Sequence, residues 1–405
     1  MFFRLVIEFM KQTKTTTLQR RRLTHLLSIC LTGLVLTGAV SVRAEPYLAI
    51  QEGYKCSKCH VNMTGGGKRT DFANVYVQTR LSSTFLNWRE LLPQSDEEEV
   101  DEDNPYKTDS TSSFFSGRLN EYVAIGGDFR WLYESNDEPG GPAEEAFNQR
   151  KQNIYLEVDL IPERVVLYQT LAEGGDAREI WGLYKDEVLD EPYYVKVGQF
   201  FLPYGLRLLD DTAFTRSVTG FTYGTTDVGL ELGFEPGPWT AQLALTNGTG
   251  SSLETNNFKR RTASLAYVHK DFRVGSSYSL NKDSDGAKTE IYGVYGGAQF
   301  GRLGILSEYD IIDTEVPGDD DVEQLAWILE FNLLVSRGNN LKLTYEYHDP
   351  SESISENARD RYSLVYEWFY AQFTQFRAGY RDNRGIPQND AQNADEYFFE
   401  THLYF

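Results

Sequence analysis

Residues 341–348 read LKLTYEYH, a stretch in which every second side chain is apolar. Leucine and tyrosine take the odd positions, and lysine, threonine, glutamate and histidine take the even ones. Successive side chains of a β-strand point to opposite faces, so this stretch predicts a strand with one apolar and one polar face. Such a strand suits a wall between lipid and a polar interior.

The same alternation recurs from residue 119 to the end of the chain. Residues 153–160 (NIYLEVDL) repeat it, and every second residue of 325–333 (LAWILEFNL) is Leu, Trp or Phe. Sixteen candidate strands can be counted, an even number as bacterial barrels require. They are expected near residues 119–134, 150–161, 163–173, 177–188, 192–200, 226–235, 238–247, 259–268, 272–282, 288–300, 303–313, 322–335, 340–349, 360–370, 372–383 and 395–405.

The connections between these segments alternate in length. Tight ones such as Pro162-Glu163 and Gly301-Arg302 recur at every second junction, and longer polar loops such as 350–359 lie between them. Outer-membrane barrels combine short periplasmic turns with longer outside loops. We therefore predict an all-β membrane protein, an antiparallel outer-membrane β-barrel of about 16 strands, with both termini in the periplasm of a Gram-negative bacterium and residues 201–225 as the third outer loop. A soluble β-sandwich or propeller is the alternative.

The first 44 residues have the organisation of an export signal. Three consecutive arginines precede an apolar stretch from Leu23 to Val40, and Val42-Arg43-Ala44 forms a small-residue cleavage site. Removal of residues 1–44 makes Glu45 the first residue. The remaining chain has 32 Lys and Arg (39 less 7) against 59 Asp and Glu (60 less 1), a net charge of −27. That charge argues against nucleic-acid binding.

A Cys-x-x-Cys-His motif, Cys56-Ser57-Lys58-Cys59-His60, follows the signal. Two thiols at this spacing reach the two vinyl groups of one porphyrin, and the next residue presents an imidazole to its iron. The motif predicts one covalent haem c, attached through Cys56 and Cys59, with His60 as the proximal axial ligand of the iron. A redox pair, a disulfide or half of a zinc site are the alternatives, and none of them requires the histidine.

The sixth ligand of such an iron has two candidates. Met63 is the only methionine after residue 44, and methionine is a known haem ligand, but it follows His60 closely for a residue that must reach the opposite haem face. His402 alternates with the lipid-facing residues of the last strand, so it should point into the lumen near the periplasmic end. A five-coordinate haem is the third arrangement.

The chain thus divides into four parts. Residues 1–44 are a signal peptide, 45–92 a monohaem cytochrome c module, 93–118 an acidic linker and 119–405 a porin-like outer-membrane β-barrel. The module should contain a helix from about Asp71 to Leu92, capped by Thr70 or Asp71. With fewer than 50 residues it can bury little core of its own, so we expect it to pack against another surface.

Two short segments resemble known signals. The chain stops at Phe405, with Leu403, Phe399 and Tyr397 on the same face, which resembles the terminal strand read by the barrel assembly machinery. Residues 198–205 (GQFFLPYG) resemble the strand-to-loop segment of phosphate-selective porins.

The whole arrangement resembles a family of outer-membrane cytochrome–porin fusions, several of which are implicated in extracellular iron oxidation. Cys56, Cys59 and His60 match the haem attachment residues of that family, and residues 46–53 fit its lead-in pattern through Pro46, Ala49 and Gly53. The chain departs from the iron-oxidising members after the motif. It has a triple glycine at 65–67 and then Asp71-Phe72-Ala73, where those members usually have a Phe-Gly and a Phe-Lys pair.

The resemblance implies an outer-membrane electron-transfer protein. One haem, held in or at the mouth of the barrel, would pass electrons between an extracellular donor or acceptor, ferrous iron among the candidates, and a periplasmic cytochrome or other soluble electron carrier. The alternative is a passive diffusion porin whose haem-bearing segment is a plug or docking module. An enzyme, either an extracellular iron oxidoreductase or a peroxidase-like protein, ranks behind a carrier because no acid–base set accompanies the motif.

Overall fold

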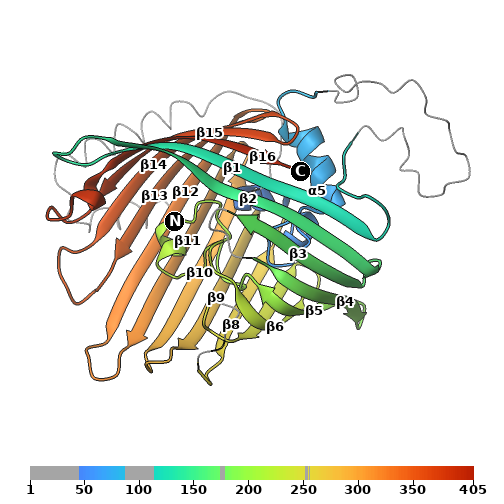
Figure 1. Ribbon diagram of the computed structural model, residues 1–405, viewed down its shortest axis with the longest axis horizontal. Helices are drawn as coiled ribbons and strands as arrows, with labels where there is room; N and C mark the ends of the chain where they lie inside the picture. The colour runs from blue at the N-terminus through green and yellow to red at the C-terminus, as the bar shows by residue number, and fades with distance from the viewer. Residues whose placement is uncertain (1–44, 87–113, 174–177, 251–253, 255) are drawn as a thin grey trace, which may run out of the picture. The chain divides into compact units, whose positions relative to one another are not determined.

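The computed structural model describes residues 45–86, 114–173, 178–250, 254 and 256–405. In these ranges sixteen antiparallel strands close into one barrel, each paired with its sequence neighbours, and the last strand pairs with the first (Figure 1). The strands are β1 (Val123–Asp137), β2 (Glu144–Ile161), β3 (Val165–Glu173), β4 (Ile180–Val188), β5 (Glu191–Phe200), β6 (Asp227–Phe234), β7 (Trp239–Thr246), β8 (Arg260–Val268), β9 (Phe272–Lys282), β10 (Lys288–Phe300), β11 (Leu303–Glu315), β12 (Val322–Ser336), β13 (Asn339–Asp349), β14 (Arg359–Ala371), β15 (Thr374–Arg384) and β16 (Asp395–Tyr404).

The two faces of each strand differ in the way the alternation predicts. In β2, Ile154 and Leu160 expose 47% and 55% of their surface, whereas Glu157 and Asp159 expose 5% and 4%. A water-soluble protein would bury the apolar set and expose the acids. The reversed order places the apolar side chains on the outside of the wall and the polar ones in the lumen, which is the arrangement of a barrel in lipid.

The sixteen-strand prediction is confirmed, and the alternation of its connections is confirmed with it. Short turns join β2 to β3, β4 to β5 and every second pair thereafter, and longer segments join the others. We call the two ends of the barrel the short-turn end and the long-loop end. The closing pair joins the start of the barrel to its last residue, because Gly127 and Phe405 exchange backbone hydrogen bonds of 3.0 and 3.1 Å.

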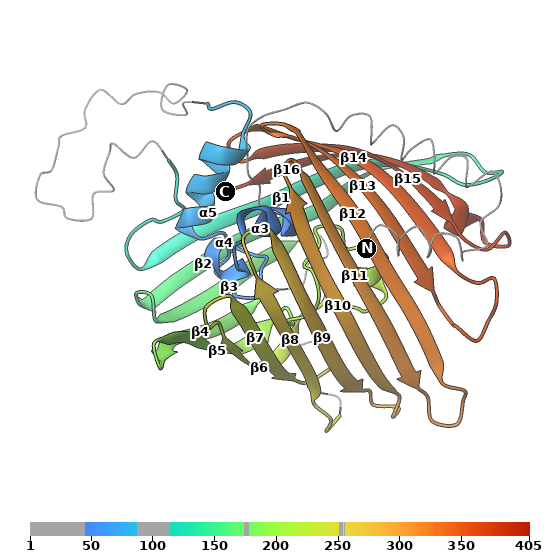
Figure 2. The same cartoon turned by 180° about the vertical axis from the view of Figure 1, so that it is seen from behind.

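The segment before the barrel enters it from the short-turn end, with the helix Asp71–Tyr76 at the mouth. This N-terminal plug, residues 45–86, contains the helices α3 (Pro46–Glu52), α4 (Cys56–Cys59) and α5 (Asp71–Tyr76), and the π-helical turn η1 (Val77–Leu81) (Figure 2). Helix α3 packs against β9, β10 and β11, and the plug touches several turns of the short-turn end. None of the helices in the described ranges is long and apolar enough to cross a membrane.

The predicted helix from Asp71 to Leu92 is shorter than expected. Thr70 caps it, since its hydroxyl oxygen accepts a hydrogen bond of 3.2 Å from the backbone N–H of Ala73. The helix loosens into η1 and ends at Leu81, because Ser83 then donates its N–H to the backbone oxygen of Phe369 at 2.8 Å. Serine pairs favour such exits, since their hydroxyls compete for backbone groups. Residues 87–92, and the predicted linker up to 113, lie outside the described residues.

The connection between β5 and β6, residues 201–225, also enters the lumen. This inserted loop carries α7 (Phe214–Ser217) and spreads over the inner faces of β9 to β15. The backbone N–H of Leu206 donates to Glu308 at 2.8 Å, and that of Phe214 donates to Glu346 at 2.7 Å. We predicted an outer loop here. The connection does begin at the long-loop end, but its apolar residues fold inward because the lumen shields them from water.

Candidate functional site

The Cys-x-x-Cys-His motif is held by a short helix and a hairpin. Cys56–Cys59 form the single turn α4, and the backbone N–H of His60 donates to the oxygen of Cys56 at 2.9 Å. The chain then doubles back, because His60 and Arg69 form an isolated antiparallel bridge. Residues 65–67, the three glycines, make the return with φ of 90, 80 and 66°. This left-handed backbone is open to glycine at little cost, which explains the triple glycine.

The tip of this hairpin is anchored to the barrel wall. Lys68 Nζ lies 2.8 Å from Glu157 of β2, and the side chain of Lys68 is fully buried. On the opposite arm, Asn62 donates its amide to Glu179 at 2.8 Å and accepts a hydrogen bond of 2.9 Å from Lys196 of β5. Buried ion pairs and hydrogen bonds of this kind impose one geometry. The motif is therefore fixed in orientation relative to the barrel.

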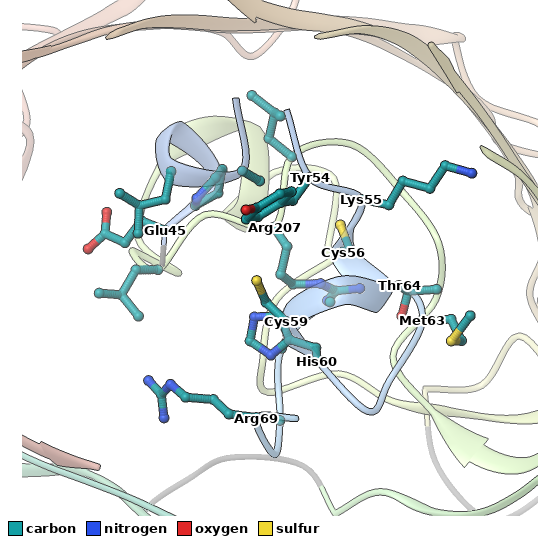
Figure 3. Close-up of a pocket in the computed structure, with 18 of the residues that line it drawn as sticks. Glu45, Tyr54, Lys55, Cys56, Cys59, His60, Met63, Thr64, Arg69 and Arg207 are labelled. Carbon is teal, nitrogen blue, oxygen red and sulfur yellow. The ribbon is translucent and has the colours of Figure 1, made fainter. Parts of the chain in front are cut away.

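The motif faces a cavity between the N-terminal plug and the inserted loop (Figure 3). The space free of atoms amounts to about 1560 Å³ when its open mouth is included. This lumen cavity is therefore continuous with open solvent and not a closed pocket. Its lining includes the motif itself together with Glu52, Met63, Arg69, Asp128, Arg130, Lys151, Arg207, Tyr223, Arg273, Tyr295, Gln375 and His402.

Cys56, Cys59 and His60 all line this cavity. Both cysteines are free thiols. Burial raises the pKa of the Cys59 thiol to about 11, and the neighbouring Cys56 adds to this shift. Burial, and secondly the positive charge of Arg69, lowers the pKa of His60 to about 4. The imidazole is therefore neutral, and the neutral form is the one that binds a metal. Its Nδ1 atom is buried and has no hydrogen-bond partner among the described residues. These three side chains fit the haem that the motif predicts.

Three arginines in the cavity add a second element of fit. The Nε atoms of Arg69, Arg207 and Arg273 are buried without a partner in the ranges that the structure describes. By contrast, Arg130 binds Asp128 at 3.0 Å. A haem carries two carboxylate arms, and guanidinium groups bind carboxylates well. The cavity therefore places three arginine side chains near the motif, the positive charge that the two carboxylates of a haem require.

The two candidates for a sixth ligand both line the cavity, and both have close neighbours. His402 is buried, with Nδ1 2.8 Å from the Gln375 side-chain oxygen and Nε2 3.0 Å from Asp128. Met63 packs against an apolar cluster of the wall and inserted loop and points away from His60 in Figure 3. The structure therefore brings Cys56, Cys59 and His60 together with both candidates around one space, and it ties His402 to other partners.

Residues of the inserted loop were not expected at the site. Arg207 and Tyr223 approach the motif from a segment more than a hundred residues away, and no local motif marks them. A signal was nevertheless present in the composition of the loop. Residues 200–208 (FFLPYGLRL) are too apolar for an exposed connection, and a loop of this composition is expected to be buried against other residues.

No family model and no curated protein matches this chain. Solved structures do match. OmpT, an outer-membrane protein of Vibrio cholerae, is 13% identical at a TM-score of 0.50, over 70% of this chain and 97% of that one. An anion-selective porin from Comamonas acidovorans is 9% identical at 0.53, over 70% and 99%. The outer membrane channel DcaP of Acinetobacter baumannii is 9% identical at 0.53, over 70% and 97%. These likenesses establish the fold, a closed 16-stranded outer-membrane β-barrel.

Proposed function

We propose that this protein carries one covalent haem c inside an outer-membrane barrel and passes electrons across the outer membrane. The observation that carries the proposal is the position of the motif. Cys56, Cys59 and His60 face a cavity inside a closed barrel, with the N-terminal plug on one side and the inserted loop on the other. A haem held there would sit part-way through a layer that otherwise insulates.

Each residue has a separate role in this proposal. Cys56 and Cys59 attach the cofactor, and His60 is the proximal ligand of its iron. Arg69, Arg207 and Arg273 line the cavity and would supply positive charge to the carboxylate arms. When bound, the haem supplies one-electron chemistry, and its potential depends on axial ligation, burial and nearby hydrogen bonds. The plug and the inserted loop line the space around it.

The direction of the two ends follows from loop length. Short turns of outer-membrane barrels face the periplasm and longer loops face outside. We infer that the plug faces a periplasmic cytochrome or other soluble carrier and that the inserted loop faces the extracellular donor or acceptor. The long-loop end is rimmed by exposed acids, among them Asp319, Asp320 and Asp321. Negative potential at a rim concentrates cations, so ferrous iron is the donor we favour.

The test begins with the cofactor. The full-length protein, produced with haem-attachment machinery, should show a covalent haem spectrum and a mass increase of one haem. Cys56→Ala combined with Cys59→Ala should lose both, and Ser57→Ala, whose hydroxyl donates to Glu235 at 2.8 Å, should retain both. In vesicles that enclose an oxidised carrier, an external reductant that cannot cross lipid should reduce that carrier only with the haem-loaded protein. Absence of covalent haem would refute the proposal.

The alternative is a passive diffusion porin with a haem-bearing plug. The likeness to an anion-selective porin and to an outer membrane channel favours it. The plug and the inserted loop oppose it, because their side chains fill much of the lumen and bind its walls. Single-channel conductance in a planar bilayer separates the two proposals. A steady open current from the haem-loaded protein would favour the porin, and a closed lumen would favour the electron carrier.

A further inference from the structure

A second cavity of the lumen lies beside the first residue that the predicted cleavage would leave. Glu45 lines it together with the inserted loop and the inner faces of β12 to β15. The side chain of Glu45 is 9% exposed, and its Oε2 atom lies 2.6 Å from Lys342 Nζ. The next residues hold this end in place, since Tyr47 donates its hydroxyl to Glu367 at 3.0 Å. Glu45 is thus deep inside the barrel.

The charges around this cavity are uneven. Its lining contains four carboxylates, Glu45, Asp210, Glu330 and Glu346, against three cations, Lys342, Arg377 and Arg381. Glu367 and Arg361, which pair with members of this set, add one charge of each sign. The Oε1 atom of Glu45 is buried without a hydrogen-bond partner in the part of the chain that the structure describes. Burial, and then the nearby carboxylate of Glu367, raises the pKa of Glu45 to about 7. A further positive charge is what this cavity lacks.

Cleavage after Ala44 would supply that charge at the right place. Hydrolysis of the Ala44–Glu45 peptide bond leaves a carboxylate on the released segment and a primary amine on Glu45, which takes up a proton to become an ammonium. We propose that this cavity is the binding site of the α-ammonium group of Glu45, with the free oxygen of Glu45 and the carboxylate of Glu330 as its partners. The start of the mature chain is then a buried structural group of the plug. This inference rests on the predicted cleavage site and is independent of haem.

Reactivity of the amine tests the site. The mass of the N-terminal peptide of the purified full-length protein is measured first, and it should begin at Glu45. The folded protein is then treated near neutral pH with an acylating reagent, which prefers a free α-amine (pKa ~7.7–8.0) to lysines (~10.4). Burial in an ion pair should slow acylation of Glu45 at least about tenfold relative to the urea-unfolded protein, since each unit of raised pKa removes about tenfold of the free amine.

Two variants make the result specific. Glu330→Gln removes one partner of the ammonium and should speed labelling in the folded protein severalfold. Glu231→Gln, which removes a buried carboxylate paired with Lys196 elsewhere in the wall, should not. A Gly-Ser-Gly-Ser insertion between Ala44 and Glu45 should be labelled equally fast folded and unfolded, which shows that the reagent reaches a free terminus.

Two outcomes would overturn the inference. One is an N-terminal residue other than Glu45. The other is labelling of the folded protein at the unfolded rate while the barrel keeps its folded mobility on unheated gels. Haem content is measured on the same samples, so a haem-free protein with a protected amine would refute the proposed electron carrier and leave this site intact.

Discussion

His402 illustrates what a single side chain can and cannot reveal. Its inward direction follows from the alternation of the last strand, and the structure places it on the lining of the lumen cavity. Its partners come from β15 and β1, which are distant in sequence, so they could not be inferred. The same holds for Arg207. The spacing of Cys56, Cys59 and His60, by contrast, is local chemistry, and residue patterns suffice to find it.

The engagement of His402 leads to a prediction about the sixth ligand. His402→Gln should leave the visible spectrum of the haem-loaded protein unchanged, because Nδ1 is hydrogen-bonded to Gln375 and Nε2 lies against Asp128. Stability should fall by about 1 kcal/mol, the typical contribution of one hydrogen bond. Spectra of the oxidised and reduced protein decide the question, with Met63→Leu recorded alongside. Loss of a low-spin spectrum in His402→Gln would identify it as the ligand.

At the scale of elements, the strands were predictable and the plug was only partly so. The strands keep a period of two because one face meets lipid and the other meets the lumen. The face to which each side chain belongs could therefore be assigned without tertiary information. The end of the helix at Leu81 depends on pairing with β14, which no local pattern encodes. The inward fold of residues 201–225 likewise depends on the space that the barrel provides.

The triple-glycine turn gives a prediction for an element. At Gly67, with φ of 66°, an added Cβ would lie 2.5 Å from the Tyr168 hydroxyl oxygen, which accepts the N–H of Lys68 at 3.0 Å. Gly140 has φ of 82°, and a Cβ there would meet nothing within 4 Å. Gly140→Ala should therefore cost only the left-handed strain, ~1–2 kcal/mol. Gly67→Ala should cost more, because it also displaces Tyr168.

Limited proteolysis of the folded protein measures this difference. Residues 45–86 should be cut several times faster in Gly67→Ala than in Gly140→Ala. Equal rates in the two variants would mean that the contact with Tyr168 does not hold the plug. Unfolding in urea, followed by tryptophan fluorescence, provides the free energy for each variant.

For the whole molecule, the alternation of connection lengths predicts which end faces the cell exterior. A peptide tag inserted at 354 in the connection between β13 and β14 should be accessible to antibody on intact cells. The same tag inserted between Gly301 and Arg302 should become accessible only after the outer membrane is permeabilised. The reverse pattern of accessibility would show that the barrel has the opposite orientation, with the plug at the cell exterior.

The closing pair of the barrel sets an order of events during biogenesis. The plug precedes β1 in the sequence, yet it binds late strands, as the contacts of Tyr47 with Glu367 and of Ser83 with Phe369 show. Once β16 pairs with β1, the thiols of Cys56 and Cys59 lie inside a continuous wall and are reached only through the open mouth of the lumen cavity. In the proposed electron carrier, haem attachment would therefore precede closure of the barrel, and the late strands would pair around a loaded plug. Under the same proposal, a protein made without haem attachment would close around an empty lumen cavity.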